Sequence, residues 1–248
     1  MQLKDKIVVV AGASGGIGRE ISKVLAREGA RVFLVARNEI VLKGLKESIE
    51  EHGGRANIYI ADLTSETSTA GLAKFLEKEA IKVDILFNAA GIGVYKKFSE
   101  LEYDEWKKSF MVNVDAAFLT THRLLHLLAK SENAYVISMG SGMGKVALPG
   151  RSAYCASKFA LRGLMLSIAK EYSKTNIHFV HLILGSVLTS FGPLTLEDKI
   201  LKQKKGKKYL DPVWLAEHIV TKIKRDSFEP ETPIYPRHYF EESKKGKT

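Results

Sequence analysis

Three side chains near the middle of the sequence could together move a proton at a carbonyl or alcohol group. Ser141 follows the apolar run "YVIS", and Tyr154 and Lys158 stand four residues apart in "SAYCASKFAL". Residues spaced by four lie on one face of an α-helix, so the phenol and the ammonium group are predicted to be neighbours. A tyrosine hydroxyl can donate or accept a proton, and a serine hydroxyl can donate a hydrogen bond without adding charge. Each residue alone is more typical of packing or of a solvated surface.

A second candidate feature is the glycine-rich stretch "AGASGGIG" at residues 11–18, directly after the apolar run "IVVV". Glycines between a strand and a helix mark the place where a doubly wound sheet binds a pyrophosphate. The N–H groups and the dipole of the helix N-terminus favour the negative charge, and Gly12, Gly16 and Gly18 leave the backbone open to approach. A tight turn that binds nothing is the alternative, because a glycine pattern alone is a weak signal.

The predicted strands and helices that position these motifs alternate regularly along the chain. Short, continuous, β-branched apolar runs alternate with helical patterns, at 7–11, 32–36, 58–61, 85–87, 135–138, 179–184 and 233–235. Such runs are typical of parallel strands that helices cover on both faces. We predict an α/β fold of the doubly wound Rossmann type, mostly a seven-stranded parallel sheet with helices on both faces, in a single domain over residues 1–240. Residues 241–248 are predicted to form a flexible tail.

Three sequence signals predict where helices begin. Asn38 is a predicted N-cap, and Asp211 is a predicted N-cap followed by proline at the first helical position. Ser99 and Glu102 match a capping box before a long helical region.

The order and spacing of the motifs resemble those of the short-chain dehydrogenase/reductase family, over nearly the whole chain. The glycine motif matches with Ala11 in place of threonine, and "NAAG" at 88–91 matches the motif after the fourth strand. Asn113 in "MVNVD" matches the structural asparagine, and "LGSVLT" at 184–189 matches the segment after the sixth strand, with Leu184 in place of proline. Ser141, Tyr154 and Lys158 match the catalytic serine and the tyrosine–lysine pair.

The resemblance implies an enzyme that interconverts a carbonyl and a secondary alcohol by hydride transfer, with Tyr154 as the acid/base. It also implies that Lys158 holds the ribose hydroxyls and that Asn113 orders a water in a proton relay. Homodimers or homotetramers formed through the helices at about 103–130 and 152–173 are expected as well. The expected cofactor-binding residues are Gly12, Ser14, Gly15, Gly16, Ile17, Gly18, Arg37, Asn38, Asp62, Leu63, Asn88, Ala89, Gly91, Tyr154, Lys158, Gly185, Val187 and Thr189.

Proton transfer by Tyr154 near neutral pH requires a lower pKa than the ordinary phenol value of about 10. An ammonium group about 4 Å away favours the phenolate by up to about 4 kcal/mol at an effective dielectric constant of about 20. That free energy corresponds to about three pKa units. We therefore predict that Lys158 lowers the pKa of Tyr154, and that a positively charged nicotinamide ring acts in the same direction.

The residues after the second strand indicate NADP(H) as the cofactor. NAD-binding proteins of this kind carry an acidic residue there, but this chain has Ala36 followed by Arg37. An arginine pairs with a 2′-phosphate through two hydrogen bonds, whereas an aspartate would repel it. A solvent-facing arginine in an NAD-dependent alcohol dehydrogenase is the alternative. Asp62 resembles the family's aspartate beside the adenine.

Composition excludes several other classes of protein. The chain has 248 residues and a formal net charge of +10, and two lysine-rich segments at 202–208 and 244–247 hold most of the excess. No recognition element accompanies the charge, so no nucleic-acid partner is predicted. Cys155 is the only cysteine, and no apolar stretch could span a membrane, so a cytoplasmic location is expected. His122 and His126 lack a third ligand, and no metal site is predicted. A non-catalytic, dinucleotide-sensing interaction protein is an alternative, but such a protein has no need for the serine, tyrosine and lysine.

The segment at about 186–210, which we call the lid, is predicted to cover the substrate. Its apolar residues indicate an apolar small-molecule substrate. The lysines in the last part of the lid, at 202–208, are interpreted as a solvated loop, since runs of like charge are mostly solvated. The alternative is that they attract an apolar substrate attached to an anion.

Overall fold

The computed structural model describes residues 1–245, with side chains as far as Glu241. Seven strands form one sheet in which every neighbouring pair is parallel, in the order β3-β2-β1-β4-β5-β6-β7. The strands are β1 (Ile7–Ala11), β2 (Arg31–Ala36), β3 (Arg55–Ile60), β4 (Ile85–Asn88), β5 (Ala134–Met139), β6 (Ile177–Leu184) and β7 (Glu231–Ile234). The α-helices are α1 (Gly16–Arg27), α2 (Glu39–Glu51), α3 (Glu66–Glu79), α4 (Tyr103–Phe110), α5 (Ala116–Leu128), α6 (Ser152–Glu171), α7 (Leu196–Lys204), α8 (Pro212–Arg225) and α9 (Pro236–Lys245).

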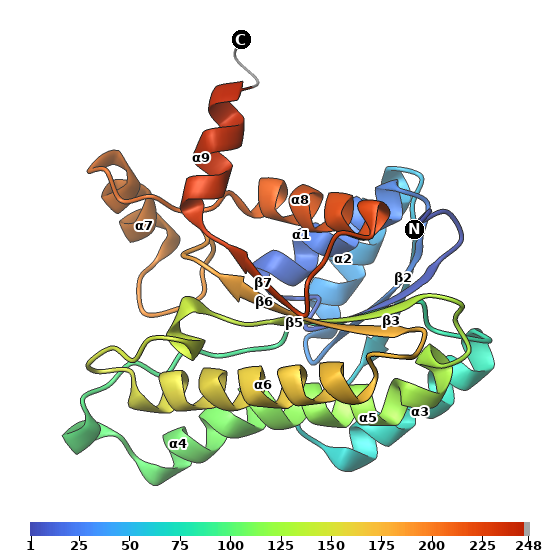
Figure 1. The fold of residues 1–248 in the computed structure, drawn as a ribbon, viewed down its shortest axis with the longest axis horizontal. Coiled ribbons are helices and arrows are strands. Elements are labelled where there is room, and N and C mark those ends of the chain that lie inside the picture. Colours follow the sequence, from blue (N-terminus) through green and yellow to red (C-terminus); the bar gives the residue numbers. More distant parts are fainter. Residues whose placement is uncertain (246–248) are drawn as a thin grey trace.

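Helices cover both faces of the sheet, as Figure 1 shows. One face packs against α1, α2 and α8, and the other packs against α3, α5 and α6. The strands are apolar at successive positions because both of their faces are buried; Val8, Val9 and Val10 of β1 are all inaccessible to solvent. This arrangement confirms the predicted doubly wound, Rossmann-type fold.

The strand order reverses between β1 and β4, and this reversal positions the candidate site. The chain runs from β1 outward to β3 and then crosses to β4 on the other side of β1. The helices that follow β1 and β4 therefore lie on opposite faces of the sheet, which leaves a crevice at the carboxyl ends of these strands. The loop after β1 and the loop after β4 meet in this crevice: a Cβ added to Gly12 would overlap the backbone nitrogen of Ala90.

Two of the three predicted helix starts are confirmed. The Asn38 side chain accepts a hydrogen bond from Val41 N at 3.0 Å, and the Asp211 side chain accepts one from Trp214 N at 2.9 Å. The predicted capping box of Ser99 and Glu102 is wrong, because Ser99 lies in a short 3₁₀ turn at 98–100. Glu102 itself is the N-cap of α4, in a capping box with Glu105.

The edge strand β3 begins earlier than its apolar pattern predicts. The apolar run starts at Ile58, but the strand starts at Arg55, which pairs with Arg31 of β2. The Arg31 side chain also donates a hydrogen bond to Asn57 at 2.9 Å. Backbone pairing and polar side-chain contacts therefore extend this strand beyond its hydrophobic part.

The C-terminal helix α9 extends away from the rest of the molecule (Figure 1). It includes the first residues of the predicted tail, and residues 246–248 of that tail lie outside the described residues. Within residues 1–245, no helix combines the length and the apolar character needed to cross a membrane.

Candidate active site

A cavity of about 820 Å³ opens at the carboxyl end of the sheet. Its wall contains three of the four predicted catalytic residues, Ser141, Tyr154 and Lys158. Ile17 from the first turn of α1, residues from the loops after β4, β5 and β6, and residues from the lid complete it. Of the predicted cofactor residues it includes Ile17, Ala89, Gly91, Gly185, Val187 and Thr189, in addition to Tyr154 and Lys158. One cavity therefore joins the candidate catalytic residues to part of the candidate cofactor site.

Helix α6 presents Tyr154 and Lys158 on its buried face, as their spacing predicts. Tyr154 is 5% exposed and Lys158 is 3% exposed. The Lys158 Nζ lies 5.8 Å from the centre of the Tyr154 ring and donates a hydrogen bond of 2.8 Å to the carbonyl oxygen of Met139. Burial lowers the pKa of Lys158 to about 8, because desolvation disfavours its charged form.

The predicted lowering of the Tyr154 pKa is wrong for the protein by itself. Burial of the phenol raises its pKa above the ordinary value, and the neighbouring Tyr95 acts in the same direction. The hydrogen bond with Ser141 lowers the pKa, but its effect is smaller than that of burial. Desolvation prevails here because the ammonium group of Lys158 is bonded to a carbonyl oxygen rather than to the phenol. Tyr154 is therefore held in its protonated form, which is the form that can donate a proton.

Ser141 lies where β5 ends and the chain turns into a 3₁₀ segment at 142–144. Its Oγ accepts a hydrogen bond of 3.2 Å from Met143 N, and this bond orients the side chain. The hydroxyl proton is not used in that bond, so Ser141 can still donate it to an oxygen atom in the cavity.

Asn113 lies behind the cavity wall, in a π-helical turn at 111–115 between α4 and α5. Its Oδ1 accepts a hydrogen bond from Ile92 N at 2.8 Å, and its Nδ2 donates one to Ile92 O at 3.0 Å. A Cβ added to Gly91 would lie 3.1 Å from Asn113 Oδ1 and 3.7 Å from Lys158 Nζ. Asn113 therefore holds the loop after β4 close to Lys158.

The N-terminus of α1 has the chemistry that a pyrophosphate requires. Gly15 is its N-cap, and among the described residues no side chain caps the helix and no acidic residue stands in its first turn. A Cβ at Gly15 would meet only the carbonyl oxygen of Gly12, at 3.5 Å, so this surface is open. Free N–H groups at an exposed helix N-terminus favour an anion, and the site fits a dinucleotide.

The other glycines of this turn are required by contacts within the protein. A Cβ at Gly18 would overlap the carbonyl oxygen of Gly12, and a Cβ at Gly16 would lie 2.7 Å from Thr189 Cγ2. Gly12 has a φ of +96°, and a Cβ there would lie 2.7 Å from the carbonyl carbon of Ala89. The glycines thus allow three segments, after β1, β4 and β6, to approach one another.

We expect Gly12→Ala to destabilise the protein by about 2 kcal/mol or more, because it combines an unfavourable φ with a backbone clash. Chemical denaturation measures this effect. Gly44→Ala is the matched control, since Gly44 lies in α2 with no atom within 4 Å of an added Cβ. The control is expected to stabilise the protein by about 0.5–1 kcal/mol. A Gly12→Ala variant as stable as the parent would contradict the assignment of this turn.

The predicted cofactor residues after β2 and β3 lie outside the wall of the large cavity. Arg37 and Asn38 follow β2, and both are exposed. The charge of Arg37 contributes to lowering the pKa of Asp62, although the main cause is the hydrogen bonds that Asp62 accepts from Thr64. Arg37 and Asp62 are therefore close enough to act on one ligand. Leu63, by contrast, is buried in the core.

The remaining predicted cofactor residues differ in their exposure. Asn88 is buried at the end of β4 and donates a hydrogen bond of 2.9 Å to Thr121 Oγ1, while its Oδ1 has no partner among the described residues. Ser14 is partly exposed, and Thr189 is buried against Gly16.

The structure adds Tyr95, Arg151 and Lys199, which the sequence patterns do not indicate, and places Phe191 of the predicted apolar lid beside Tyr154. Tyr95 and Phe191 place their ring centres 5.4 Å and 5.9 Å from that of Tyr154. The guanidinium group of Arg151 lies 4.9 Å from the centre of the Tyr95 ring. Lys199 of α7 is 6% exposed and donates hydrogen bonds to the carbonyl oxygens of Thr189, at 2.7 Å, and of Phe191. Lys199 therefore fastens α7 to the first part of the lid, which lies beside Tyr154.

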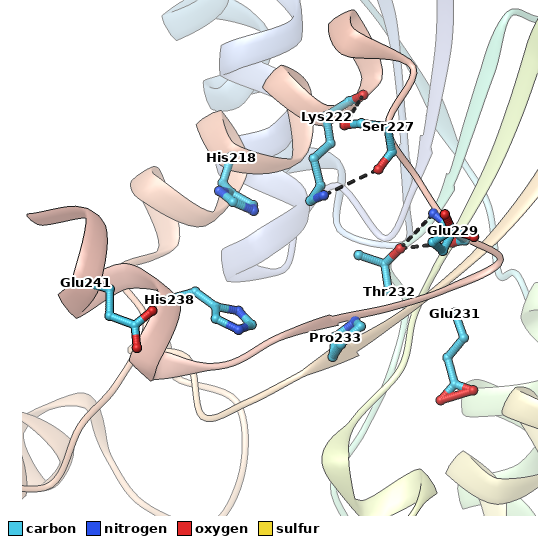
Figure 2. Close-up of a pocket in the computed structure, with 9 residues that line it drawn as sticks. All are labelled: His218, Lys222, Ser227, Glu229, Glu231, Thr232, Pro233, His238 and Glu241. Carbon is cyan, nitrogen blue, oxygen red and sulfur yellow. Dashed lines mark hydrogen bonds between the residues drawn. The ribbon is translucent and has the colours of Figure 1, made fainter. Parts of the chain in front are cut away.

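A second cavity, of about 440 Å³, lies between α8, β7 and α9. Figure 2 shows its histidines, His218 and His238, on different helices, and Glu231 pointing away from both. No three histidine, cysteine, aspartate or glutamate side chains in the described part of the chain are placed to hold a metal ion.

The fold and the cavity define a dinucleotide-binding type of oxidoreductase scaffold, and comparison with known proteins gives its family. The model of the short chain dehydrogenase family matches residues 6–199. The chain belongs to this family. A relative from Escherichia coli strain K12, the uncharacterized oxidoreductase YciK, is 38% identical over 176 residues, which cover 69% of this chain and 70% of the relative. Cyclopentanol dehydrogenase of Comamonas sp. is 32% identical over 176 residues, which cover 71% and 70% of the two chains.

Solved structures have the same fold. A metagenomic short-chain oxidoreductase in complex with NADP superposes with a TM-score of 0.81 at 27% identity and covers 95% of this chain and 99% of its own. Other structures of this fold hold NADPH or NAD.

Proposed function

We propose that this protein is an NADP(H)-dependent oxidoreductase that interconverts a carbonyl compound and a secondary alcohol. The observation that carries the proposal is the grouping of Ser141, Tyr154 and Lys158 in the wall of one cavity, beside Ile17 of α1 and residues from the loops after β4 and β6. The name of the cyclopentanol dehydrogenase relative supports a reaction between an alcohol and a carbonyl.

A nicotinamide dinucleotide held by the N-terminus of α1 and by Arg37 would supply the hydride, and hence both electrons, for reduction of the carbonyl carbon. Ser141 donates a hydrogen bond to the carbonyl oxygen, which orients and polarises it. Tyr154 donates its hydroxyl proton to the same oxygen as negative charge develops there, and the alcohol is formed. The resulting phenolate regains a proton from solvent. Lys158 stabilises that phenolate by its positive charge.

In the protein by itself, burial raises the pKa of Tyr154 and keeps the phenol protonated, which is the form that reduction requires. Oxidation of an alcohol requires the phenolate as the base. We infer that the positively charged oxidised cofactor lowers the pKa of Tyr154 for that direction. Asn113, which fixes the loop after β4, acts in this scheme as a positioning residue, and the proton relay implied by the family is part of the proposal.

The preference for NADP(H) follows from the charge at the end of β2. Arg37 is exposed there and Ala36 is buried, so the expected ribose site has a cation and lacks the acidic residue that NAD-binding proteins use. The NADP complex of the metagenomic oxidoreductase supports this choice. Asp62, close to Arg37, is proposed to lie beside the adenine.

A panel of ketones, aldehydes and secondary alcohols tests the function. The purified protein is mixed with NADPH and each carbonyl, or with NADP⁺ and each alcohol, and the absorbance of the reduced cofactor is followed. We expect consumption of NADPH with at least one apolar carbonyl. Turnover with NADH that exceeds turnover with NADPH for every active substrate would instead favour the NAD-dependent alternative.

We further propose that two or four copies of the chain assemble through α4, α5 and α6. Large apolar side chains are exposed on these helices and the turn between them: Met111, Phe118 and Phe159. Ala153 of α6 is buried within its own chain and does not belong to this surface. A stable dimer buries about 1,600 Å² and survives dilution to micromolar concentration.

Light scattering at micromolar concentration is expected to show a dimer or a tetramer, and Phe118→Glu combined with Phe159→Glu is expected to give a single chain. Circular dichroism of the variant controls for folding. A parent protein that scatters as one chain would refute the proposed assembly.

A further inference from the structure

The lid carries a cluster of positive charge on its cavity side. Helix α7 begins at a capping box formed by Thr195 and Asp198. Lys199, Lys202 and Lys205 follow at intervals of three, so they share one face of the helix. All three belong to the wall of the large cavity. The hydrogen bonds of Lys199 to the segment beside Tyr154 fix this orientation of the face.

The chain reverses at the end of α7 and brings a fourth lysine, Lys207, to the same wall of the cavity. Gly206 has a φ of +93°, and it follows the C-cap residue Lys205. Lys207 N donates a hydrogen bond of 3.0 Å to Lys202 O, and Gly206 N donates one to Gln203 O, also 3.0 Å long. These are the two bonds of a Schellman motif, which reverses the chain. Lys207 therefore lies beside Lys202 and also lines the cavity.

Lysines at a helix C-terminus interact favourably with the helix dipole, but this does not explain which lysines face the cavity. Lys204 and Lys208 belong to the same sequence run and are not part of its wall. No carboxylate within the described residues forms an ion pair with Lys202, Lys205 or Lys207, and the cavity wall contains no aspartate or glutamate. Like charges gathered in this way repel one another, and an anion between them would remove that repulsion.

Apart from Arg151, whose guanidinium group lies over the Tyr95 ring, the rest of the substrate side of the cavity is mainly apolar. Tyr95, Val146, Leu148 and Leu194 line it, together with Phe191 beside Tyr154. A ligand that fits both parts has an apolar body near Tyr154 and a negative charge near the lid. This separation of apolar wall and cationic rim is the observation from which the substrate class follows.

We propose that the substrate is an apolar carbonyl compound that ends in an anionic group, held by Lys202, Lys205 and Lys207 when its carbonyl lies against Tyr154. The inference rests on the proposed function and specifies its substrate class. The three lysines attract the anion as the ligand enters, and the effect weakens as salt screens the charges.

The test compares a variant with Lys202, Lys205 and Lys207 changed to glutamine with a control that loses the same charge elsewhere. The control changes Lys204, Lys208 and Lys130, which are exposed and do not line the cavity. The probes are medium-chain keto acids, with the ketone at increasing distance from the carboxylate, each paired with its neutral methyl ester. Activity is measured with saturating NADPH across a salt series.

We expect the cavity-side variant to lose about tenfold or more of kcat/KM for the best keto acid at low salt, and to keep the value for the ester. The control variant is expected to keep both values. In the parent, salt should lower kcat/KM for the keto acid and not for the ester.

Two outcomes would overturn the proposal, and a third separates it from the proposed function. If each protein, the parent and the cavity-side variant, had the same kcat/KM for the keto acid as for its ester, the carbonyl reaction would stand, but the three lysines would have no role in binding the substrate. An increase in the KM for NADPH with the ester as substrate would assign them to the cofactor. If the parent reduces no carbonyl, the proposed function fails, and calorimetry then decides the substrate class: the parent must bind a keto acid more tightly than its ester, and the cavity-side variant must lose that difference.

Discussion

Replacing Tyr154 by phenylalanine is expected to abolish turnover and leave cofactor binding nearly intact. The substitution removes one hydroxyl group and keeps the ring, which packs against Tyr95 and Phe191. General acid catalysis by a positioned group contributes about 10²–10⁴-fold to the rate. We therefore expect kcat in the direction of reduction to fall by about a thousandfold.

The measurement combines steady-state kinetics with calorimetric titration of NADPH. Tyr172→Phe is the matched control, because Tyr172 stands at the far end of the same helix and packs against Phe179. The control should retain the parental kcat. A Tyr154→Phe enzyme that turns over within a few-fold of the parent would show that another group donates the proton.

The second expected result concerns the cofactor. Changing Arg37 to aspartate should weaken the binding of NADP(H) by about a hundredfold and affect NAD(H) far less. A hydrogen-bonded charge pair contributes about 1.5–3 kcal/mol, and the new carboxylate adds repulsion from the 2′-phosphate. Because Arg37 is exposed at the end of β2, the substitution should not affect folding.

Calorimetric titration of NADP⁺ and NAD⁺ against the parent and the variant decides this point. Arg37→Gln separates the two contributions, since it removes the attraction without adding repulsion, and its affinity should lie between the other two. If the parent binds NAD⁺ more tightly than NADP⁺, the assignment of Arg37 to the 2′-phosphate is wrong.

The fold could be predicted well because strands whose two faces are both buried appear in the sequence as continuous apolar runs. Strand β1 is apolar at every position and β6 at all but His178 and His181, and two of the helices have clear caps, at Asn38 and Asp211. The first half of β3 could not be predicted, since its pairing with β2 depends on backbone hydrogen bonds and on the contact between Arg31 and Asn57. Ser99 and Glu102 could each have been the N-cap of the same helix, and the sequence alone does not decide between them.

From residue spacing alone, the candidate site was predictable only where its residues share one element; the family resemblance added Ser141, which lines the same cavity. Tyr154 and Lys158 are four apart on α6, so their proximity follows from helix geometry. Tyr95 and Arg151 come from separate segments and meet only in the folded chain, and no periodic pattern marks them. The pKa of Tyr154 was predicted with the wrong sign, because spacing indicates the neighbouring charge but not the burial that outweighs it.

For the turn after β1, too, the sequence predicted only part of what the structure shows. Its glycines predict close approach to the backbone, which is correct, but for Gly12 and Gly18 the approaching atoms belong to the protein itself. Only the open surface at Gly15 and the uncapped start of α1 are suited to a ligand.

The most direct test of the central claim follows the hydride itself. NADPH carrying deuterium at the transferable position of its nicotinamide ring is incubated with the protein and a panel of apolar carbonyl compounds, with and without an anionic end group. Mass spectrometry then locates the label in the products. We predict one deuterium on the carbinol carbon of at least one alcohol product, formed about a thousandfold more slowly when Tyr154→Phe replaces the parent. Consumption of NADPH without deuterium in any alcohol, or no reduction of any carbonyl, would contradict the claim that this cavity reduces carbonyl groups.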